Sequence, residues 1–490
     1  MDREPELIDT PEAGPVVIRG SLIRTAGWVG GLALGALSAP LIIRHLGEAE
    51  YGRFLPIISL VAVIAIIADN AMANVAIREY SAAHRDERAE LLRNLLGMRL
   101  ALTGAGLAIV LGFGVLAGYT KTQIAGMAIA GLWLVIADYQ GAVQAPMAVG
   151  LRLGWISSIE MVRQVVTVAA IAAFVIAGAG LLPFFIAAPA GSAAALLVTA
   201  ALVRREASWV PAFDRARWRH VFGQVLPVAA ATTFGSLYFR IVLIVMSLAG
   251  TAAQTGHFSV SFRIMEIVLA VPGVIVTSAF PILARAAQND RARLDYALSR
   301  IGEVGVILGT WIALSLWLLA PLAIDLVSGG RDSETIWALR LQSLSMPASF
   351  LIASWAAGLL SLRANRDLLL VNSSALVTSL VLSLALIGPL GAKGGALAIS
   401  LTELLLAAAY GLAVRRRSAL RLAPRVTLLV PVVTAAAVAA GFLMPGPEPI
   451  GAIVATAIYF GVLLAARAVP AEILEALTRR GPAAAPADPA

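Results

Sequence analysis

Long apolar stretches recur along nearly the whole chain, and short polar connections separate them. Because an α-helix rises about 1.5 Å per residue, a stretch of about 20 residues crosses the ~30 Å hydrocarbon core of a bilayer. About 14 such segments are expected, at residues 21–43, 53–77, 97–118, 122–148, 153–178, 181–203, 221–248, 257–283, 300–327, 335–361, 367–389, 394–413, 425–444 and 449–468. The pattern predicts an all-α polytopic membrane protein.

The basic residues lie mostly in alternate connections. With the N-terminus inside, 28 arginines fall on the cytoplasmic side, whereas the opposite connections hold only Arg44, Arg53, Lys121, Arg331 and Lys393. Cytoplasmic loops of membrane proteins carry this excess of positive charge. The bias therefore predicts that both termini are cytoplasmic, and it explains the net charge of +8 without a nucleic-acid partner.

Composition narrows the chemistry further. The chain has 490 residues, of which 59% are hydrophobic and 13% charged, which is outside the range of soluble proteins. It has no cysteine, which excludes disulfides, thiolate metal sites and cysteine nucleophiles. The four histidines have no ligand-like spacing, and neither of the two lysines lies in a phosphate-binding loop. We therefore expect no metal, no cofactor and no ATP-driven pump.

A weak internal repeat divides the chain. Leu46-Gly47 and Tyr51-Gly52-Arg53-Phe54 follow the first segment, and Ala249-Gly250 and Thr255-Gly256-His257-Phe258 follow the seventh. With six segments in each half, both halves enter the membrane from the same side, so a pseudo-two-fold axis along the membrane normal would relate them around a central site. The expected parts are a cytoplasmic tail at 1–20, six-helix halves at 21–203 and 221–413, a cytoplasmic linker at 204–220, two extra helices at 425–468 and a cytoplasmic tail at 469–490.

Ionisable side chains inside the predicted segments need an explanation, because each costs about 2.5–3.5 kcal/mol on insertion scales. They are Asp69, Asp138, Glu160, Arg163, Arg240, Arg263, Glu266, Arg340 and Glu403. Glu160 with Arg163, and Arg263 with Glu266, stand three residues apart and can pair along one helix face. Mutual neutralisation at a helix contact is therefore one interpretation of these four residues.

A binding site for an anion is the other interpretation of the arginines. Arg240 has no acidic residue three or four positions away, and Arg263 lies near the outer start of its segment. Together with Arg163 they would line a central cavity, with Arg24 at the inner mouth of the first segment. The alternatives are that Arg240 and Arg263 extend to the outer headgroups, and that Arg24 anchors to the inner ones.

Two aspartates in the cytoplasmic half of the membrane have no local partner. Asp69 lies in the second segment and Asp138 in the fourth. Either could carry a coupling proton or sodium ion, or form an interhelical salt bridge in the region of Arg163. The five acids inside the segments nearly balance the four arginines, so charge counting alone does not establish a cationic cavity.

Short motifs in the first two segments point to a family. The first segment ends in an Arg-x-Leu-Gly turn followed by Tyr-Gly and an aromatic residue, at Arg44, Leu46, Gly47, Tyr51, Gly52 and Phe54. The second holds Asp69 and ends in Arg78-Glu79. In these features the chain resembles Wzx-type polysaccharide flippases, members of the superfamily that also holds the MATE antiporters and the peptidoglycan-precursor flippase. Ala71 stands where that family usually has glycine.

The resemblance implies a function. Such a protein moves an oligosaccharide on an isoprenoid diphosphate from the cytoplasmic to the outer leaflet of the bacterial cytoplasmic membrane, by alternating access of its two halves, for surface polysaccharide synthesis. Guanidinium groups suit the diphosphate oxygens. The implied partners are the lipid-linked oligosaccharide, membrane lipids and the polysaccharide polymerase machinery.

Two other functions are open. A cation- or drug-coupled antiporter of the same fold would place acids in its cavity. An enzyme acting on lipid-linked sugars would need catalytic residues on outer loops, which are short in this chain; the candidates there are Asp325, Arg331, Asp332 and Glu334, which a solvated rim also explains.

Overall fold

A computed structural model describes residues 13–82, 85–144, 146–147, 152–204, 209–419 and 423–470. Within these ranges the regular structure is entirely helical, as predicted. In the described residues, each segment expected from the apolar pattern coincides with helix. Eleven helices of the described residues are long and apolar enough to cross a membrane, and the shorter apolar helix Thr233–Ala249 accompanies them. The chain is a multi-pass membrane protein.

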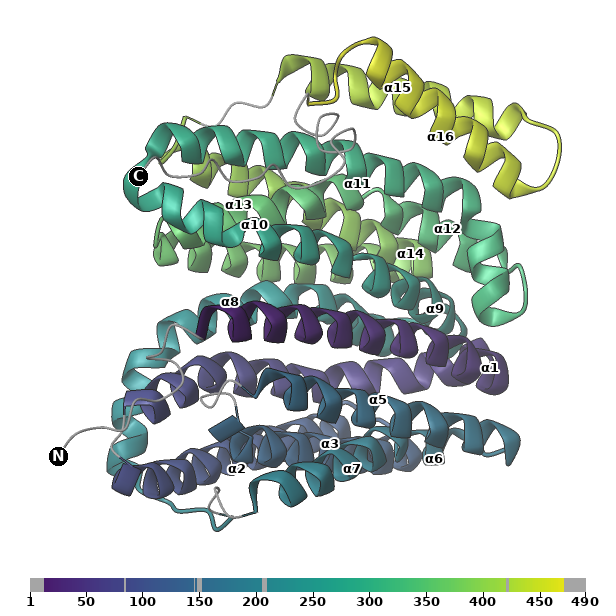
Figure 1. The fold of residues 1–490 in the computed structure, drawn as a ribbon. Helices are drawn as coiled ribbons and strands as arrows, with labels where there is room; N and C mark the ends of the chain where they lie inside the picture. Colours follow the sequence, from purple (N-terminus) through teal and green to yellow (C-terminus); the bar gives the residue numbers. More distant parts are fainter. Residues whose placement is uncertain are drawn as a thin grey trace. The chain divides into compact units, whose positions relative to one another are not determined.

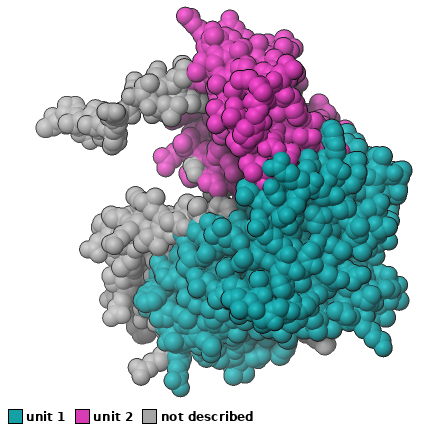
Figure 2. Space-filling view, turned by 90° about the vertical axis from the view of Figure 1, so that its right-hand side faces the viewer, with its two compact units in different colours: residues 1–267, 324–338, 369–402 teal, residues 268–323, 339–368, 403–490 magenta. Residues whose placement is uncertain are grey.

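The chain forms two compact units, which Figure 2 colours separately. The first comprises residues 1–267, 324–338 and 369–402, and the second comprises residues 268–323, 339–368 and 403–490. Helices of the first unit are α1 (Ala13–Ala82), α2 (Arg85–Leu116), α3 (Lys121–Val143), α5 (Leu153–Ile176), α6 (Leu181–Phe184), α7 (Ala187–Val203), α8 (Arg215–Ala249) and most of α9 (Ala252–Val268). Helices that lie wholly or partly in the second are α10 (Ala270–Asn289), α11 (Arg291–Ser328), α12 (Ser333–Ser343), α13 (Met346–Ser361), α14 (Asn365–Arg415), α15 (Pro424–Leu443) and α16 (Glu448–Ala465).

The two longest elements each hold two predicted segments. α1 runs over 70 residues and breaks at Gly47, where φ is 77°, and α14 runs over 51 residues and breaks at Gly391, where φ is 56°. Only glycine adopts such left-handed backbone without a steric cost. At Gly47 an added Cβ would meet nothing within 4 Å, so the backbone conformation itself requires glycine there. The chain reverses at these breaks, and α1 folds back on itself (Figure 1).

α1 lies at the centre of the first unit and contacts α2, α3, α5 and α8. Gly27, Gly31 and Gly35 form a row along α1 with a spacing of four residues, and the first two permit the approach to α5. A Cβ on Gly27 would lie 3.1 Å from the Ser157 Cβ, and one on Gly31 would lie 3.4 Å from the Gln164 Cγ. The third glycine of the row, Gly35, faces Arg263 of α9 instead.

The two repeat motifs meet directly. A Cβ on Gly52 of α1 would lie 2.5 Å from the backbone nitrogen of Gly256 on α9, and one on Gly256 would lie 2.4 Å from the carbonyl oxygen of Glu48. Gly52 and Gly256 occupy equivalent positions of the repeat. Two equivalent residues that lie next to a pseudo-two-fold axis are expected to contact each other, as these two do. Backbone touches backbone here, and no larger residue fits without displacing a helix.

In the second unit the last two helices pack against α11. Their core includes Leu314, Val430 and Tyr459, all at most 1% exposed. The Tyr459 hydroxyl donates a hydrogen bond to the Ile307 carbonyl oxygen at 2.9 Å, and α15 and α16 lie side by side (Figure 1). A buried phenol needs such a partner because an unpaired hydroxyl in an apolar core is costly.

Candidate functional site

Three charged side chains meet inside the first unit. Arg240 projects from α8, and Arg263 and Glu266 project from α9. Arg240 Nη2 lies 3.0 Å from Glu266 Oε1, and Arg263 Nη1 lies 2.6 Å from Glu266 Oε2. One carboxylate therefore binds two guanidinium groups, one with each oxygen. We refer to Arg240, Arg263 and Glu266 as the arginine cluster.

α1 supplies neutral partners to the same cluster. Arg263 Nη2 donates a hydrogen bond to the carbonyl oxygen of Gly35 at 3.3 Å, and Arg240 Nη1 donates one to the Ser59 hydroxyl at 3.4 Å. Gly35 lies in the first predicted segment and Ser59, which is fully buried, lies in the second. The two parts of α1 thus hold one arginine each, so the cluster joins α1, α8 and α9.

The arginine cluster carries a net positive charge and is partly exposed. Two guanidinium groups face one carboxylate, and the three side chains remain 23–27% exposed. A guanidinium has five N–H donors, and the contacts above use two from each arginine. The remaining donors can bind further oxygen atoms. An anion with several oxygens, such as a phosphate or diphosphate, suits this arrangement.

Arg163, which the sequence grouped with these arginines, takes part in a different set of contacts. It lies on α5, where its Nη1 is 3.2 Å from Glu160 Oε2, and its Nη2 donates to Gln140 Oε1 of α3 at 2.5 Å. Gln140 in turn donates to the Thr199 hydroxyl of α7 at 3.2 Å. The pairing of Glu160 with Arg163 is therefore present, and a polar network between three helices extends it.

Of the remaining predicted site residues, the side chain of Asp138 is described and those of two others are not. Asp138 of α3 is 3% exposed and accepts a hydrogen bond from the Thr103 hydroxyl of α2. Arg99 of α2, also buried, donates to the Asp138 carbonyl oxygen at 3.5 Å. The side chains of Arg24 and Asp69 lie outside the described residues.

The members of the arginine cluster could be predicted from the sequence, but their full pairing could not be predicted from residue spacing alone. The spacing of three residues predicted a pair of Glu266 with Arg263, and lipid headgroups were the alternative for Arg240, whereas Glu266 binds both arginines. The sequence does contain a feature that predicts the second pairing. A short turn joins α8 to α9, so the two helices are antiparallel neighbours, and Arg240 and Arg263 lie at similar distances from the turn. Ser59 and the Gly35 carbonyl carried no signal at all, since neither residue type indicates binding.

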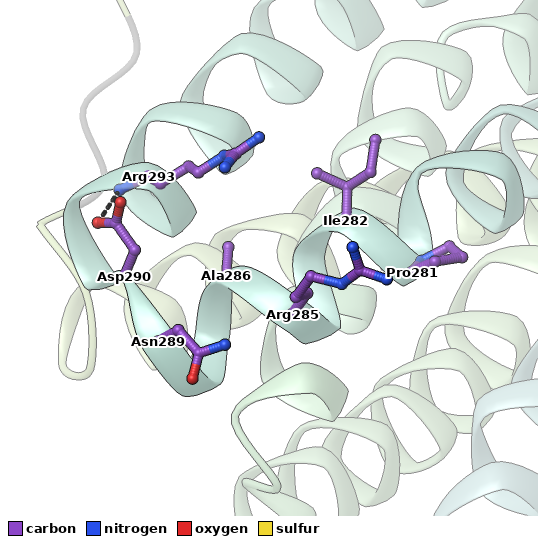
Figure 3. A pocket seen from close by; sticks show the side chains of 7 residues that line it. All are labelled: Pro281, Ile282, Arg285, Ala286, Asn289, Asp290 and Arg293. Atoms are coloured by element: carbon purple, nitrogen blue, oxygen red, sulfur yellow. Dashed lines mark hydrogen bonds between the residues drawn. The ribbon is translucent and has the colours of Figure 1, made fainter. Parts of the chain in front are cut away.

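A separate pocket lies in the second unit where α10 meets α11 (Figure 3). It encloses about 300 Å³ and is lined by residues that include Pro281, Arg285 and Arg293. Asp290 between the two helices accepts a hydrogen bond from the Arg293 backbone nitrogen at 3.0 Å.

The many apolar helices, with a cationic cluster held among them, define a polytopic membrane protein. The sequence matches the family described as "Polysaccharide biosynthesis protein" over residues 17–287, which is more than half of the chain. The chain belongs to this family, and the resemblance noted in the first two segments is confirmed. No curated protein matched the sequence.

Solved structures agree on the fold. A structure titled "Lipid II flippase MurJ, inward closed conformation" is 12% identical, with a TM-score of 0.76, and the match covers 91% of this chain and 99% of that one. An inward-facing multidrug resistance MATE family transporter of the MOP superfamily is 14% identical, with a TM-score of 0.64 and coverage of 79% and 94%. A MOP superfamily transporter from Pyrococcus furiosus, 14% identical, matches with a TM-score of 0.56 over 82% of this chain and 95% of that one. The fold is therefore that of the MOP superfamily.

Proposed function

We propose that the protein moves an isoprenoid-diphosphate-linked oligosaccharide from the cytoplasmic to the outer leaflet of the bacterial cytoplasmic membrane, for the synthesis of a surface polysaccharide. The observation that carries the proposal is the arginine cluster, in which Glu266 holds Arg240 and Arg263 together. The family and the fold that the chain shares with a lipid II flippase support it.

The cluster suits a diphosphate for a physical reason. Two unpaired guanidinium groups would repel each other, and Glu266 offsets one of the two charges while it fixes both side chains. Rigid, pre-oriented donors bind more tightly because less side-chain entropy is lost on binding. The sugars need only a polar path, and the isoprenoid tail can remain in lipid. Arg24 and Arg163 remain proposed contributors to the same path.

The energy for export can come from the membrane potential. Moving one charge across 100 mV is worth about 2.3 kcal/mol. Two negative charges leaving a cell with an inside potential of about −100 mV therefore gain roughly 4–5 kcal/mol. In the mechanism we propose, the halves at 21–203 and 221–413 rock about the linker at 204–220, and the helices at 425–468 stand outside the repeat. Both termini are cytoplasmic in this account, and a polysaccharide polymerase receives the exported product.

A second candidate is a cation- or drug-coupled antiporter. The buried carboxylate of Asp138, held by the Thr103 hydroxyl, favours it, because ion-coupled transporters use acidic residues within the membrane. The similarity to a multidrug MATE transporter agrees with this candidate at the level of fold. Asp69 and Asp138 are the proposed coupling residues under either function. The arginine cluster places this candidate second.

A strain that lacks the gene tests the proposal. Loss of surface polysaccharide together with accumulation of the lipid-linked oligosaccharide supports it, provided that the wild type restores both and that Arg240→Ala or Arg263→Ala does not. Arg331→Ala is the matched control, because Arg331 pairs with Asp325 where both side chains are more than 40% exposed. Unchanged polysaccharide with altered sensitivity to cationic drugs would favour the antiporter instead.

A further inference from the structure

A histidine and two carboxylates from three parts of the first unit converge near the start of α9. Glu48 follows the Gly47 break in α1, His257 lies in the first turns of α9, and Asp332 immediately precedes α12. His257 Nδ1 lies 2.7 Å from Glu48 Oε2 and 3.2 Å from Asp332 Oδ1. The Thr335 hydroxyl lies 3.1 Å from the same nitrogen. The donor atoms of the three ionisable residues all lie within 4.8 Å of one another.

One nitrogen therefore faces three oxygen atoms. A single N–H on Nδ1 can form one well-directed hydrogen bond, so it cannot serve Glu48, Asp332 and Thr335 equally. A cation placed among these atoms would bind all of them at once. It would also balance the two carboxylate charges, which a proton on the imidazole offsets only by half.

The surrounding structure fixes the carboxylates in position. Asp332 Oδ1 accepts hydrogen bonds from the Thr335 backbone nitrogen at 2.9 Å and from its hydroxyl at 3.1 Å, as the residue before a helix does. The backbone of Glu48 is pressed against Gly256, next to His257. Nearby Glu334 pairs with Lys393 at 2.8 Å and is thus engaged elsewhere.

We propose that Glu48, His257 and Asp332 form a binding site for a divalent cation of the Zn²⁺ class. Zinc binds imidazole nitrogen at about 2.0–2.1 Å and carboxylate oxygen at about 2.0–2.2 Å in a tetrahedron, which places neighbouring donor atoms about 3.4 Å apart. The separations of 2.7 and 3.2 Å from His257 need to open by about 0.7 and 0.2 Å to reach this geometry. Solvent can supply the fourth ligand, because the three side chains are 22–40% exposed.

The site would fasten α1, α9 and α12 to one another. It adjoins the backbone contact between Gly52 and Gly256, where the two repeat motifs touch. A bound cation would therefore stabilise the conformation in which these helices meet. Cation binding at this site does not depend on which cargo the protein transports.

Metal titration of the purified full-length protein, stripped with a chelator, tests the site. We expect a single Zn²⁺ per chain, with binding weakened at least about tenfold by His257→Gln, Glu48→Gln or Asp332→Asn. His45→Gln and Glu50→Gln are the matched controls. His45 bonds to the Ala179 carbonyl oxygen at 2.8 Å, and Glu50 pairs with Arg53 at 2.6 Å, so neither should change the affinity. Mg²⁺ should not compete, because imidazole favours zinc over magnesium.

A spectroscopic variant covers the case in which these substitutions impair folding. The chain has no cysteine, so His257→Cys introduces a unique thiol. With Co²⁺ as the probe, this variant should show a thiolate-to-cobalt charge-transfer band, and His45→Cys should not. Absence of saturable Zn²⁺ binding by the wild type, equal binding by the wild type and His257→Gln, or no charge-transfer band from His257→Cys would each overturn the proposal.

Discussion

Glu266→Gln gives the sharpest test of the arginine cluster. The substitution keeps the shape of the side chain but removes the negative charge from between Arg240 and Arg263, whose contacts with it are 3.0 and 2.6 Å long. Removing one partner of a buried ion pair costs about 3–5 kcal/mol, because the remaining charge is left uncompensated. Since these side chains are about a quarter exposed, we expect the lower end, near 3 kcal/mol.

This penalty converts into a measurable change of melting temperature. Unfolding entropy is about 2.1 cal/mol/K per residue, so a chain of 490 residues that unfolds as one unit should lose about 3 °C in Tm for ~3 kcal/mol. Thermal unfolding of the detergent-purified protein, followed by tryptophan fluorescence, measures the shift. If only the first unit unfolds, the unfolding entropy is smaller, so the decrease in Tm is larger.

A double-mutant cycle separates the pair from general destabilisation. Arg240→Gln, Glu266→Gln and the double variant should show a coupling energy of about 1–3 kcal/mol, because the double variant leaves fewer uncompensated charges than the two single variants together. If the two single effects add within about 0.5 kcal/mol, the two residues do not interact in the folded protein. That result would refute the description of the cluster.

Two further substitutions test a close helix contact and a buried hydrogen bond. Gly52→Ala should destabilise by about 3 kcal/mol, since its Cβ would lie 2.5 Å from the backbone of Gly256, which cannot yield as a flexible side chain does. Gly104→Ala on α2 is the matched control; its Cβ meets nothing within 4 Å, so it should be neutral or stabilise by up to about 1 kcal/mol. Tyr459→Phe should lower stability by about 1 kcal/mol through the lost hydrogen bond to Ile307, with transport unchanged. The melting temperatures of the three variants check these values. If Gly52→Ala is as stable as Gly104→Ala, the contact between Gly52 and Gly256 is not formed. If Tyr459→Phe is as stable as the wild type, the hydrogen bond to Ile307 is not formed.

The helices could be predicted because local sequence determines them. Runs of about 20 apolar residues form membrane helices whatever their neighbours are, so every predicted segment coincides with helix in the described residues. The breaks within α1 and α14 were also accessible, since Gly47 and Gly391 stand at the junctions between adjacent apolar runs. The division into two six-helix halves rests on the repeat alone and stays a prediction.

The pairing of charges could not be predicted from spacing alone. Salt bridges at three residues along one helix were visible, as with Glu160 and Arg163. Glu266 binding Arg240 depends instead on which helices are neighbours, and the group of Glu48, His257 and Asp332 joins positions as much as 284 residues apart. For this reason the four histidines show no ligand-like spacing in the sequence. Tertiary packing brings these groups together, and the periodicity of the sequence contains no information about it.

Direct transport in proteoliposomes tests the central claim most closely. The purified protein is reconstituted with an isoprenoid-diphosphate oligosaccharide, and a glycosidase added outside measures how much glycan reaches the outer leaflet. The account predicts that the wild type exposes the glycan, that an inside-negative potential accelerates exposure, and that Arg240→Ala and Arg263→Ala abolish it while Arg331→Ala does not. If the wild type leaves the glycan protected under an imposed potential, or if both arginine variants move it as fast as the wild type, the protein does not carry a lipid-linked diphosphate through the arginine cluster.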